Sequence, residues 1–377
     1  MGFVRKTPAG AFRACWRDPA GKQRSKTFRT KREAGAFLAE VESALNRGTY
    51  VAPDAGRLRF GDYAARWLAG RNDERATAAR DSSIMRNHVI PRWGTVPLSK
   101  IEHSAVQAWI SELGQRLSPA SVRECYRLTT GVMRSAVRDR LLGFNPCDGV
   151  RLPPRRRLDT DELVITRDEL IAKLRPAVPD RYRALVALAG GTGLRWGECA
   201  GLCWDAIDPY AATVRVIRVA EEVSGHVRLK PYPKSRAGRR SVPLPGFAVA
   251  ALAEHRQRFG NHPDGLVFVA STGAPLKRGT FRAKVWKPSL QRAGLPLALR
   301  FHDLRHSYAT WLVSDGVPVN DVAKVMGHEQ TSTTLNRYTH STAERDLRVL
   351  RSFAAYSLPP GSDTGPQNAE DPSEEGP

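Results

Sequence analysis

Hydrophobic and polar residues alternate from Gly2 to Phe28, which is the spacing of short β-strands. The turn-forming residues Asp18 to Gly21 separate two of these runs. From Thr30 the apolar residues recur at helical spacing, and Thr30 with Glu33 matches a capping box at the start of a helix. Residues 1–50 are therefore predicted to form a three-stranded sheet followed by one helix.

Residues 58–146 show helical spacing throughout. Pro53 and Gly56 break the pattern before this region and mark a linker. The last helix is predicted to begin at Ser118 and Pro119, because serine is a favoured N-cap and proline fits the first helical turn. This part of the chain is predicted to be an all-helical domain.

A third domain is predicted at residues 163–355, and it begins with a second capping box, Thr166 to Glu169. Helical spacing returns after Phe247 and continues to about Phe353. Between these helical parts, alternation predicts short strands at Thr213–Val219, Val227–Leu229 and Ser241–Leu244. The domain is therefore expected to mix helices and strands.

Two segments have the composition of loops. Residues 147–162 carry Pro153-Pro154 and the basic run Arg155-Arg156-Arg157, which predicts a basic linker. Residues 356–377 are dominated by Pro, Gly, Ser and acidic residues without apolar periodicity, so a disordered acidic tail is expected. The predicted fold class is multidomain and mainly α, with small β-sheets in the first and third domains.

The charge balance indicates a polyanionic partner. The chain of 377 residues has 59 Lys and Arg against 38 Asp and Glu, a formal charge of +21. Arg13, Arg17 and Lys26 on the first sheet, together with Arg155, Arg156 and Arg157 in the linker, are candidate DNA-binding residues. The alternative for the sheet residues is a solvated face without a partner.

Cysteine usage and hydropathy narrow the class of protein further. The five cysteines are odd in number and form no CxxC pair, so neither a zinc cluster nor a disulfide framework is expected, and a reducing cytoplasm fits. The sequence has no apolar stretch near the roughly 20 residues of a membrane span and no signal-peptide core at its start. We expect a soluble bacterial cytoplasmic protein that associates with the nucleoid.

Three segments carry residues suited to phosphate chemistry. In Phe301 to His306, His302 and Arg305 are three residues apart and share a helix face, which joins a phosphate-binding fork to a group that titrates near neutral pH. Upstream, Arg195 follows the glycine-rich turn Gly191 to Gly193, and Glu198 is placed to orient it. The glycines fit neither GxxxxGK[ST] nor GxGxxG, which argues against a nucleotide site.

Tyr338 is the candidate nucleophile, in the segment Arg337-Tyr338-Thr339-His340. A phenol is a feasible nucleophile only where cationic or hydrogen-bonding groups stabilise the developing charges. His328, ten residues upstream, and Arg305 are candidates for part of this stabilisation.

These segments occur in the order TGLRWGE, a basic hairpin at Pro233–Leu244, HDLRH, GH and RYTH. In this order they resemble the catalytic domain of tyrosine recombinases of the phage integrase family, over about Thr166 to Phe353. The helical region resembles the family's core-DNA-binding domain, of the SAM-like type. The N-terminal sheet and helix resemble its arm-site-binding domain.

The resemblance implies a role for each site residue. Arg195 and Arg305 would bind the non-bridging oxygens of the scissile phosphate, with His328 adding a hydrogen bond. Tyr338 would attack phosphorus, and His302 would assist proton transfer. Lys234 would protonate the departing 5′-oxygen, with Lys230 as a second choice, and Glu198 would support the site.

The family reaction is a transesterification through a 3′-phosphotyrosine, which implies no metal and no cofactor. The resemblance also implies double-stranded DNA attachment sites as substrate, a homotetramer on paired sites, and possible DNA-bending and directionality factors. The element could be a prophage or a conjugative transposon. A helix from Thr342 to about Leu350 is expected to dock on a neighbouring protomer or to pack on its own domain, and the sequence leaves both open.

Two other functions are compatible with parts of the pattern. A type IB topoisomerase shares the tyrosine chemistry, but the arm-like N-terminal domain favours an integrase. An inactive DNA-binding relative would lack the reactive residues, whereas every expected position is filled here. The prediction is therefore a site-specific recombinase that integrates or excises a mobile element.

Overall fold

The computed structural model describes residues 2–154, 163–231 and 238–327. The chain divides into two compact units: the first comprises the residues up to Thr160 together with the short segment Glu222–His226, and the second comprises the rest. The first unit holds two separate hydrophobic cores, one around the N-terminal sheet and one among the helices that follow. In the described residues, no helix is both long and apolar enough to cross a bilayer.

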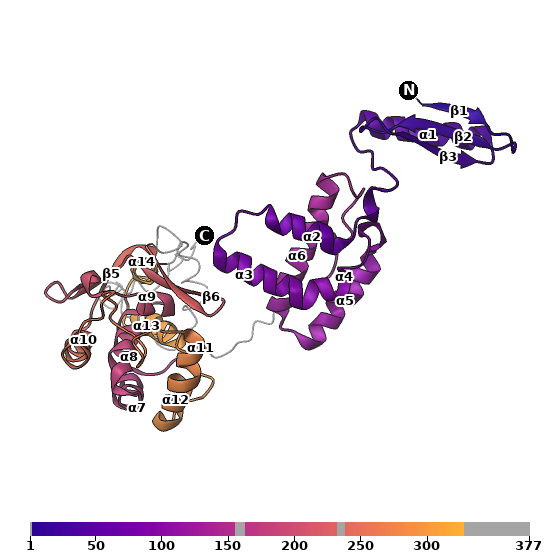
Figure 1. Cartoon of the computed structure of the whole chain (residues 1–377). Helices are drawn as coiled ribbons and strands as arrows, with labels where there is room; N and C mark the ends of the chain where they lie inside the picture. The colour runs from indigo at the N-terminus through magenta and orange to yellow at the C-terminus, as the bar shows by residue number, and fades with distance from the viewer. Residues whose placement is uncertain (1, 155–162, 232–237, 328–377) are drawn as a thin grey trace, which may run out of the picture. The chain divides into compact units, whose positions relative to one another are not determined.

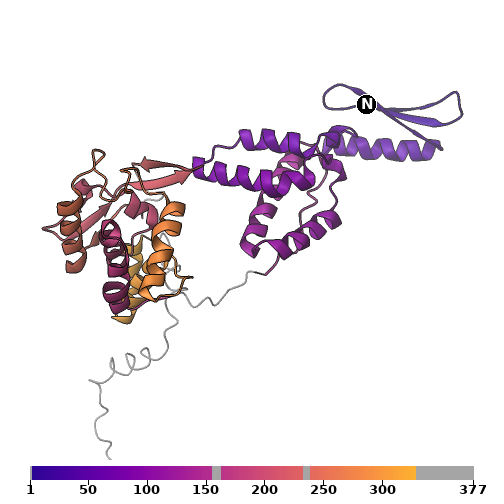
Figure 2. The same ribbon diagram turned by 60° about the horizontal axis from the view of Figure 1, so that its bottom comes forward.

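The N-terminal part is an antiparallel sheet with one face covered by helix α1 (Lys31–Asn46) (Figures 1 and 2). Its strands are ordered β1-β2-β3, with bounds Phe3–Lys6, Phe12–Arg17 and Gln23–Phe28. The predicted capping box is confirmed, because Thr30 accepts from the Glu33 amide and the Glu33 carboxylate accepts from the Thr30 amide. Trp16 lies between sheet and helix, and its Nε1 donates to the Tyr50 hydroxyl at 2.8 Å.

The following helices form a second core around Trp93, Trp109 and Met133. Ser118 caps the longest helix as predicted. A buried carboxylate, Asp81, contacts three arginines of this region, and its side chain is fully buried. The helices are α2 (Phe60–Ala69), α3 (Arg75–Ile84), a π-helical turn (Met85–Val89), α4 (Ile90–Trp93), α5 (His103–Arg116) and α6 (Pro119–Arg138).

The second unit combines helices with two small antiparallel sheets, ordered β4-β5-β8 and β6-β7. Its helices are α7 (Arg175–Ala177), α8 (Asp180–Thr192), α9 (Trp196–Ala200), α10 (Gly246–Phe259), α11 (Arg278–Phe281), α12 (Lys287–Ala293), α13 (Asp303–Ser314) and α14 (Val319–Met326). Its strands are β4 (Ile207–Asp208), β5 (Thr213–Val216), β6 (Val219–Val223), β7 (His226–Lys230) and β8 (Arg240–Pro243).

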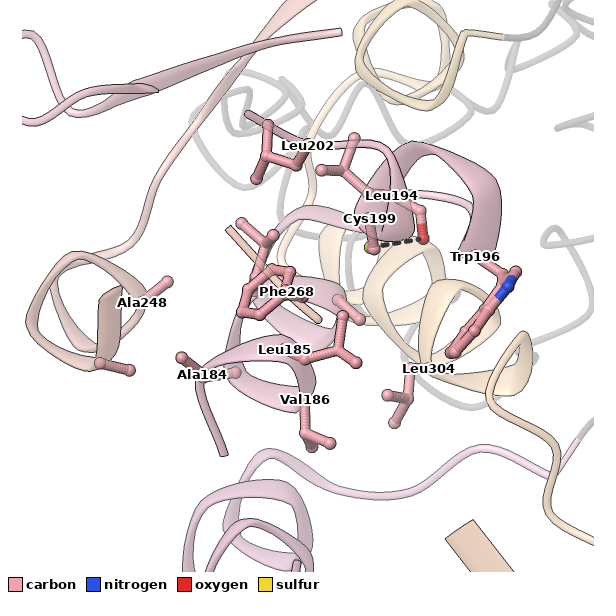
Figure 3. Close-up of a cluster of buried hydrophobic side chains, with 14 of the residues drawn as sticks. Ala184, Leu185, Val186, Leu194, Trp196, Cys199, Leu202, Ala248, Phe268 and Leu304 are labelled. Carbon is pink, nitrogen blue, oxygen red and sulfur yellow. Dashed lines mark hydrogen bonds between the residues drawn. The ribbon is translucent and has the colours of Figure 1, made fainter. Parts of the chain in front are cut away.

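Helix α8 is the centre of this unit, because every residue from Ala184 to Thr192 is buried. It packs against α10 and α13, and Leu185 lies among Phe268 and Leu304 in the resulting core (Figure 3). Full burial of a leucine or phenylalanine stabilises a fold by about 1.5–3 kcal/mol. The site residues described below lie at the ends of these helices, so the packed core fixes their positions.

One predicted strand is wrong, and the predicted basic hairpin is only partly described. Thr213–Val219 is not one strand but belongs to β5 and β6, which lie in different sheets. The chain turns between them, where Arg218 forms a bidentate pair with Asp205 at 2.7 and 2.8 Å. The predicted basic hairpin at Pro233–Leu244 lies partly outside the described residues; in its described part β8 pairs with β5, whereas β7 pairs with β6.

All five cysteines are buried and free. Burial raises the pKa of Cys125 and of Cys147 to about 11. It also raises the pKa of Cys199 and of Cys203. A thiol that stays protonated is a poor nucleophile, so these side chains contribute to packing.

Candidate active site

A tight turn delivers Arg195 to the surface of the second unit. Helix α8 ends at Gly193, which has a left-handed backbone with φ +63°. A Cβ at this position would lie 2.5 Å from the ring of Tyr308, so only glycine fits. The chain then places Leu194 in the core and Arg195 at the N-cap of α9.

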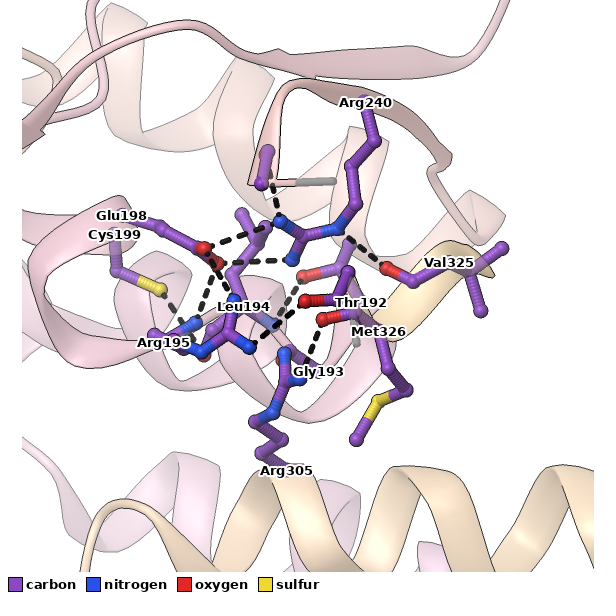
Figure 4. Close-up of polar contacts among 12 residues, drawn as sticks. Thr192, Gly193, Leu194, Arg195, Glu198, Cys199, Arg240, Arg305, Val325 and Met326 are labelled. Atoms are coloured by element: carbon purple, nitrogen blue, oxygen red, sulfur yellow. Dashed lines mark hydrogen bonds and ion pairs between the residues drawn. The ribbon is translucent and has the colours of Figure 1, made fainter. Parts of the chain in front are cut away.

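The carboxylate of Glu198 joins two arginines (Figure 4). Its Oε1 accepts from Arg195 Nη1 at 2.9 Å and from Arg240 Nη1 at 3.1 Å. Its Oε2 accepts from Arg240 Nη2 at 2.9 Å and from the Arg195 amide at 2.8 Å. Glu198 therefore holds Arg195 through both the side chain and the backbone of that arginine.

The charge state of Glu198 follows from these neighbours. Burial alone would raise the pKa of the carboxyl group, since only 3% of its side chain is exposed. The hydrogen bonds from Arg240 and the positive charges of Arg240 and Arg195 outweigh burial, and the pKa is lowered. Glu198 is therefore ionised at neutral pH.

Arg305 comes from the first turn of α13 and is buried. Its Nη1 donates to the Gly193 carbonyl at 2.7 Å, and its Nη2 donates to the Met326 carbonyl. These contacts connect the α8–α9 turn to the C-terminal end of α14, which are far apart in the sequence.

Three successive carbonyls at the end of α14 each accept from a different arginine. These pairs are Arg240 Nε with Val325 at 2.6 Å, Arg305 Nη2 with Met326, and Arg195 Nη2 with Gly327 at 3.1 Å. Carbonyls at a helix C-terminus lack intrahelical partners and carry partial negative charge, so cations stabilise them. The arginines therefore fix the point from which the chain continues to His328.

His302 is the N-cap residue of α13 and lies beside the buried ring of His306, with 4.9 Å between ring centroids. Desolvation by the surrounding atoms and the positive charge of Arg305 lower the pKa of His302 to about 4. The residue nevertheless keeps an exposed surface. Its imidazole is therefore neutral at pH 7 and able to accept a proton.

Arg195 and His302 both line a cleft of about 1000 Å³. Three more arginines line it, namely Arg278, Arg282 and Arg300, and aromatic side chains including Trp196 and Phe301 form part of its wall. A concave surface with this charge concentrates anions. Among the residues of the described ranges, no three His, Cys, Asp or Glu side chains come together as metal ligands.

Four predicted site residues, Arg195, Glu198, His302 and Arg305, are thus part of one region of the second unit. Lys234, His328 and Tyr338 lie outside the described residues, as do the linker residues Arg155, Arg156 and Arg157 and the helix proposed after Thr342. Lys230, the second choice for the general acid, forms an ion pair with Glu221 at 3.2 Å.

The predicted DNA-binding residues of the N-terminal sheet do not share one face. Ala14 and Trp16 point toward α1, so Arg13 and Arg17 project from the opposite face. Lys26 pairs in register with Ala14 and lies on the helix side, with its Nζ 4.6 Å from the centre of the Phe37 ring.

Arg240 is a site residue that the sequence reasoning missed. The strand spacing contains the signal, because Arg240, Val242 and Leu244 are two residues apart and the last two are buried. An arginine on the buried side of a strand requires a partner, and Glu198 is that partner.

Residues 163–345 match the phage integrase family, and residues 59–114 match the N-terminal SAM-like domain of phage integrases. A tyrosine recombinase XerC-like protein of Caldanaerobacter subterraneus subsp. tengcongensis is 30% identical over 370 residues, covering 89% of this chain and 93% of the relative. The phiRv2 prophage integrase of Mycobacterium tuberculosis is 28% identical over 358 residues, covering 93% of this chain and 94% of the relative.

The fold is also similar to solved integrases. The Tn1549 transposon integrase in complex with a circular intermediate DNA has a TM-score of 0.68 at 20% identity, covering 78% of this chain and 99% of that one. A lambda integrase tetramer bound to a Holliday junction has a TM-score of 0.55 at 18% identity, covering 88% and 94%. The family match and the relationship to the XerC-like protein over 89% of the chain show that this chain belongs to the phage integrase family: it is a tyrosine recombinase, an enzyme that cuts and rejoins DNA at specific sites.

Proposed function

We propose that Arg195 and Arg305 bind the scissile phosphate and that Tyr338 is the nucleophile that attacks it. The supporting observation is the convergence of the two guanidinium groups, from α9 and α13, on the same turn and helix end. Within the described residues, the Arg195 guanidinium donates one hydrogen bond from Nη1 and one from Nη2. Its other N–H groups can donate to phosphate oxygens. Loss of one such donor from a preorganised site costs about 10²–10³ in rate.

The proposed chemistry is a pair of transesterifications: a cleavage, and then its reversal, in which a 5′-hydroxyl of the partner strand attacks the phosphotyrosine and releases the Tyr338 oxygen, which takes back its proton. The Tyr338 oxygen forms a bond to phosphorus, and the bond from phosphorus to the 5′-oxygen breaks. Neutral His302 accepts the phenolic proton, Lys234 donates a proton to the departing 5′-oxygen, and His328 donates a hydrogen bond to a non-bridging oxygen. One phosphodiester replaces another, so the step needs no nucleotide hydrolysis.

Lys234 is preferred over Lys230 as the general acid. The ammonium of Lys230 pairs with Glu221 at 3.2 Å, a contact between β7 and β6. A general acid must instead reach the leaving group and release its proton easily. Replacing Lys230 with methionine is therefore expected to preserve cleavage, whereas Lys234→Met removes it.

The DNA contacts outside the active site are proposals of the same kind. Arg13 and Arg17 on the uncovered sheet face are suited to phosphates or base edges of an arm site, whereas Lys26 is partly occupied by aromatic rings. Arg155, Arg156 and Arg157 would cross the DNA backbone between domains.

The proposed assembly is a homotetramer on two attachment sites. Recombination exchanges four strands, and the lambda integrase has been seen as a tetramer on a Holliday junction. The segment after Thr342 would join neighbouring protomers, with DNA-bending and directionality factors acting on the assembly. The enzyme would work on chromosomal DNA in the bacterial cytoplasm, and it would integrate or excise a mobile element such as a prophage.

Covalent capture from a randomised pool tests the nucleophile and selects the core of the attachment site in one experiment. A pool of nicked duplexes with a randomised core is incubated with the enzyme and without ATP, and DNA that remains attached after denaturation is sequenced. Wild type should enrich one core sequence and Tyr338→Phe should capture none. A covalent complex that persists in Tyr338→Phe would contradict the assignment.

Tyr308→Phe is the matched control for this experiment. Tyr308 belongs to the same unit and lies close to Gly193 and Arg305, but burial raises the pKa of its phenol. It should capture DNA as wild type does. Linked sites on one plasmid then distinguish recombination from relaxation of supercoils alone.

A further inference from the structure

Arg240 occupies the centre of the site without facing the cleft. It is the first residue of β8, and only 6% of its side chain is exposed. Within the described residues, its guanidinium donates four hydrogen bonds. They go to both Glu198 oxygens, to the Val325 carbonyl and to the Gly238 carbonyl at 3.0 Å. A guanidinium has five N–H donors, so little capacity remains for a substrate phosphate.

These bonds join two parts of the site that Arg195 and Arg305 also connect. On one side Arg240 shares the carboxylate that orients Arg195. On the other side it holds the Val325 carbonyl, three residues before His328. We propose that Arg240 is a positioning residue for strand cleavage, which sets the orientation of Arg195 through Glu198 and the position of the C-terminal end of α14 through the Val325 carbonyl. This inference rests on the proposed role of Arg195 in phosphate binding.

The shared carboxylate also controls the charge available to the phosphate. Glu198 carries one negative charge, and Arg240 forms two of its four contacts in this site. Without Arg240, the carboxylate would interact with Arg195 alone, and it would draw this guanidinium toward itself. A displacement of 1 Å at a reacting centre can cost about 10²-fold in rate.

Lysine is the informative replacement at position 240. It retains the charge but has no planar fork, so it cannot bind both carboxylate oxygens and the Val325 carbonyl together. On the core selected by wild type, Arg240→Lys is expected to form the covalent complex about 10- to 100-fold more slowly. Its DNA affinity should stay within about 3-fold of wild type, because the residue makes no proposed DNA contact.

A modified substrate separates positioning from a general effect on folding. A methylphosphonate at the scissile position lacks one anionic oxygen. Its cleavage therefore depends less on the arginines that bind the phosphate oxygens. The defect of Arg240→Lys should therefore shrink at least 5-fold on this substrate, about as the defect of Arg195→Lys does. The double variant with Arg195→Lys and Arg240→Lys should cleave almost as fast as Arg195→Lys alone, because both changes act through the guanidinium at position 195.

Arg218→Lys is the matched control. Arg218 also binds a carboxylate, that of Asp205, through both of its Nη groups. In the described structure it contacts neither Glu198 nor α14. Its cleavage rate should equal that of wild type. If Arg240→Lys folds poorly, Arg240→Met with Glu198→Gln removes both buried charges together, a change that folds often tolerate, and the slow cleavage should remain.

Wild-type cleavage by Arg240→Lys would overturn the inference, as would a defect that is equal on both substrates and additive with Arg195→Lys. Failure of wild type to capture any DNA would instead contradict the proposed nucleophile and its phosphate site. The two failures are therefore distinguishable.

Discussion

The sharpest stability prediction concerns Glu198→Gln. Glutamine has the same shape, but its amide has no charge and directs an NH₂ group toward one of the two arginines. Arg240, with 6% of its side chain exposed, would keep its charge without a carboxylate. Removing one member of a buried ion pair costs about 3–5 kcal/mol. For a unit of this size, each kcal/mol shifts the unfolding temperature by about 2–4 °C, so a decrease of about 10 °C is expected.

The matched control is Glu254→Gln, because Glu254 is another glutamate that pairs with two arginines. Glu254 pairs with Arg175 at 3.3 Å and with Arg258 at 3.5 Å, but 48% of its side chain is exposed. Exposed pairs contribute about 0–1 kcal/mol. Urea unfolding at pH 7, followed by far-UV circular dichroism, measures both. A cost below about 1 kcal/mol for Glu198→Gln, or an equal cost for the two variants, would refute the burial argument.

The pH dependence gives an independent check. The folded-state pKa of Glu198 lies below its ordinary value of 4.5, so its contribution is complete above that value. The contribution is lost as the pH falls through the folded-state pKa. The stability difference between wild type and Glu198→Gln should therefore be constant from pH 6 to 8 and should shrink in acid.

Three further predictions concern other parts of the fold. Gly193→Ala should destabilise the protein by about 2 kcal/mol more than Gly294→Ala, because both glycines have φ near +64° but only the first has a neighbour within 4 Å; equal losses in chemical denaturation would contradict this. His302 has a lowered pKa of about 4, so its neutral ring should support stability above pH 6.5, and this support should be lost as the pH falls toward 4; a ring pKa above 6 in an NMR titration would be inconsistent. Asp81→Asn should cost about 2 kcal/mol, since the fully buried carboxylate accepts from Arg127 at 2.7 Å while this arginine is partly exposed, and an unchanged urea midpoint would argue against the network.

Local signals predicted much of the secondary structure. The capping box at Thr30 and the N-cap at Ser118 are made by atoms close in sequence, and the structure contains both. The three N-terminal strands follow from alternation and a turn at Asp18. Such features depend on neighbours within a few residues, which the sequence displays directly.

Features set by distant contacts were harder to predict. The separation of β5 from β6 depends on partner strands and on the pair of Arg218 with Asp205. Arg239 and Arg240 are adjacent arginines in a basic run, and the run itself does not distinguish them. In the structure Arg239 is exposed, whereas Arg240 binds a carboxylate 42 positions away. Motif order predicted Arg195 and Arg305 as candidate site residues, whereas their shared contacts with the end of α14 required the folded structure.

The burial of the native thiols makes the enzyme suitable for site-specific labelling. With a pKa of about 11, Cys125 and Cys147 would be thiolates in only about one molecule in 10⁴ at pH 7, and maleimides react with the thiolate. Tyr210 is completely exposed, so a cysteine placed there would react much faster. A fluorophore at this position, paired with another in the helical domain, would report distances between the two units in solution while all five native cysteines remain in place.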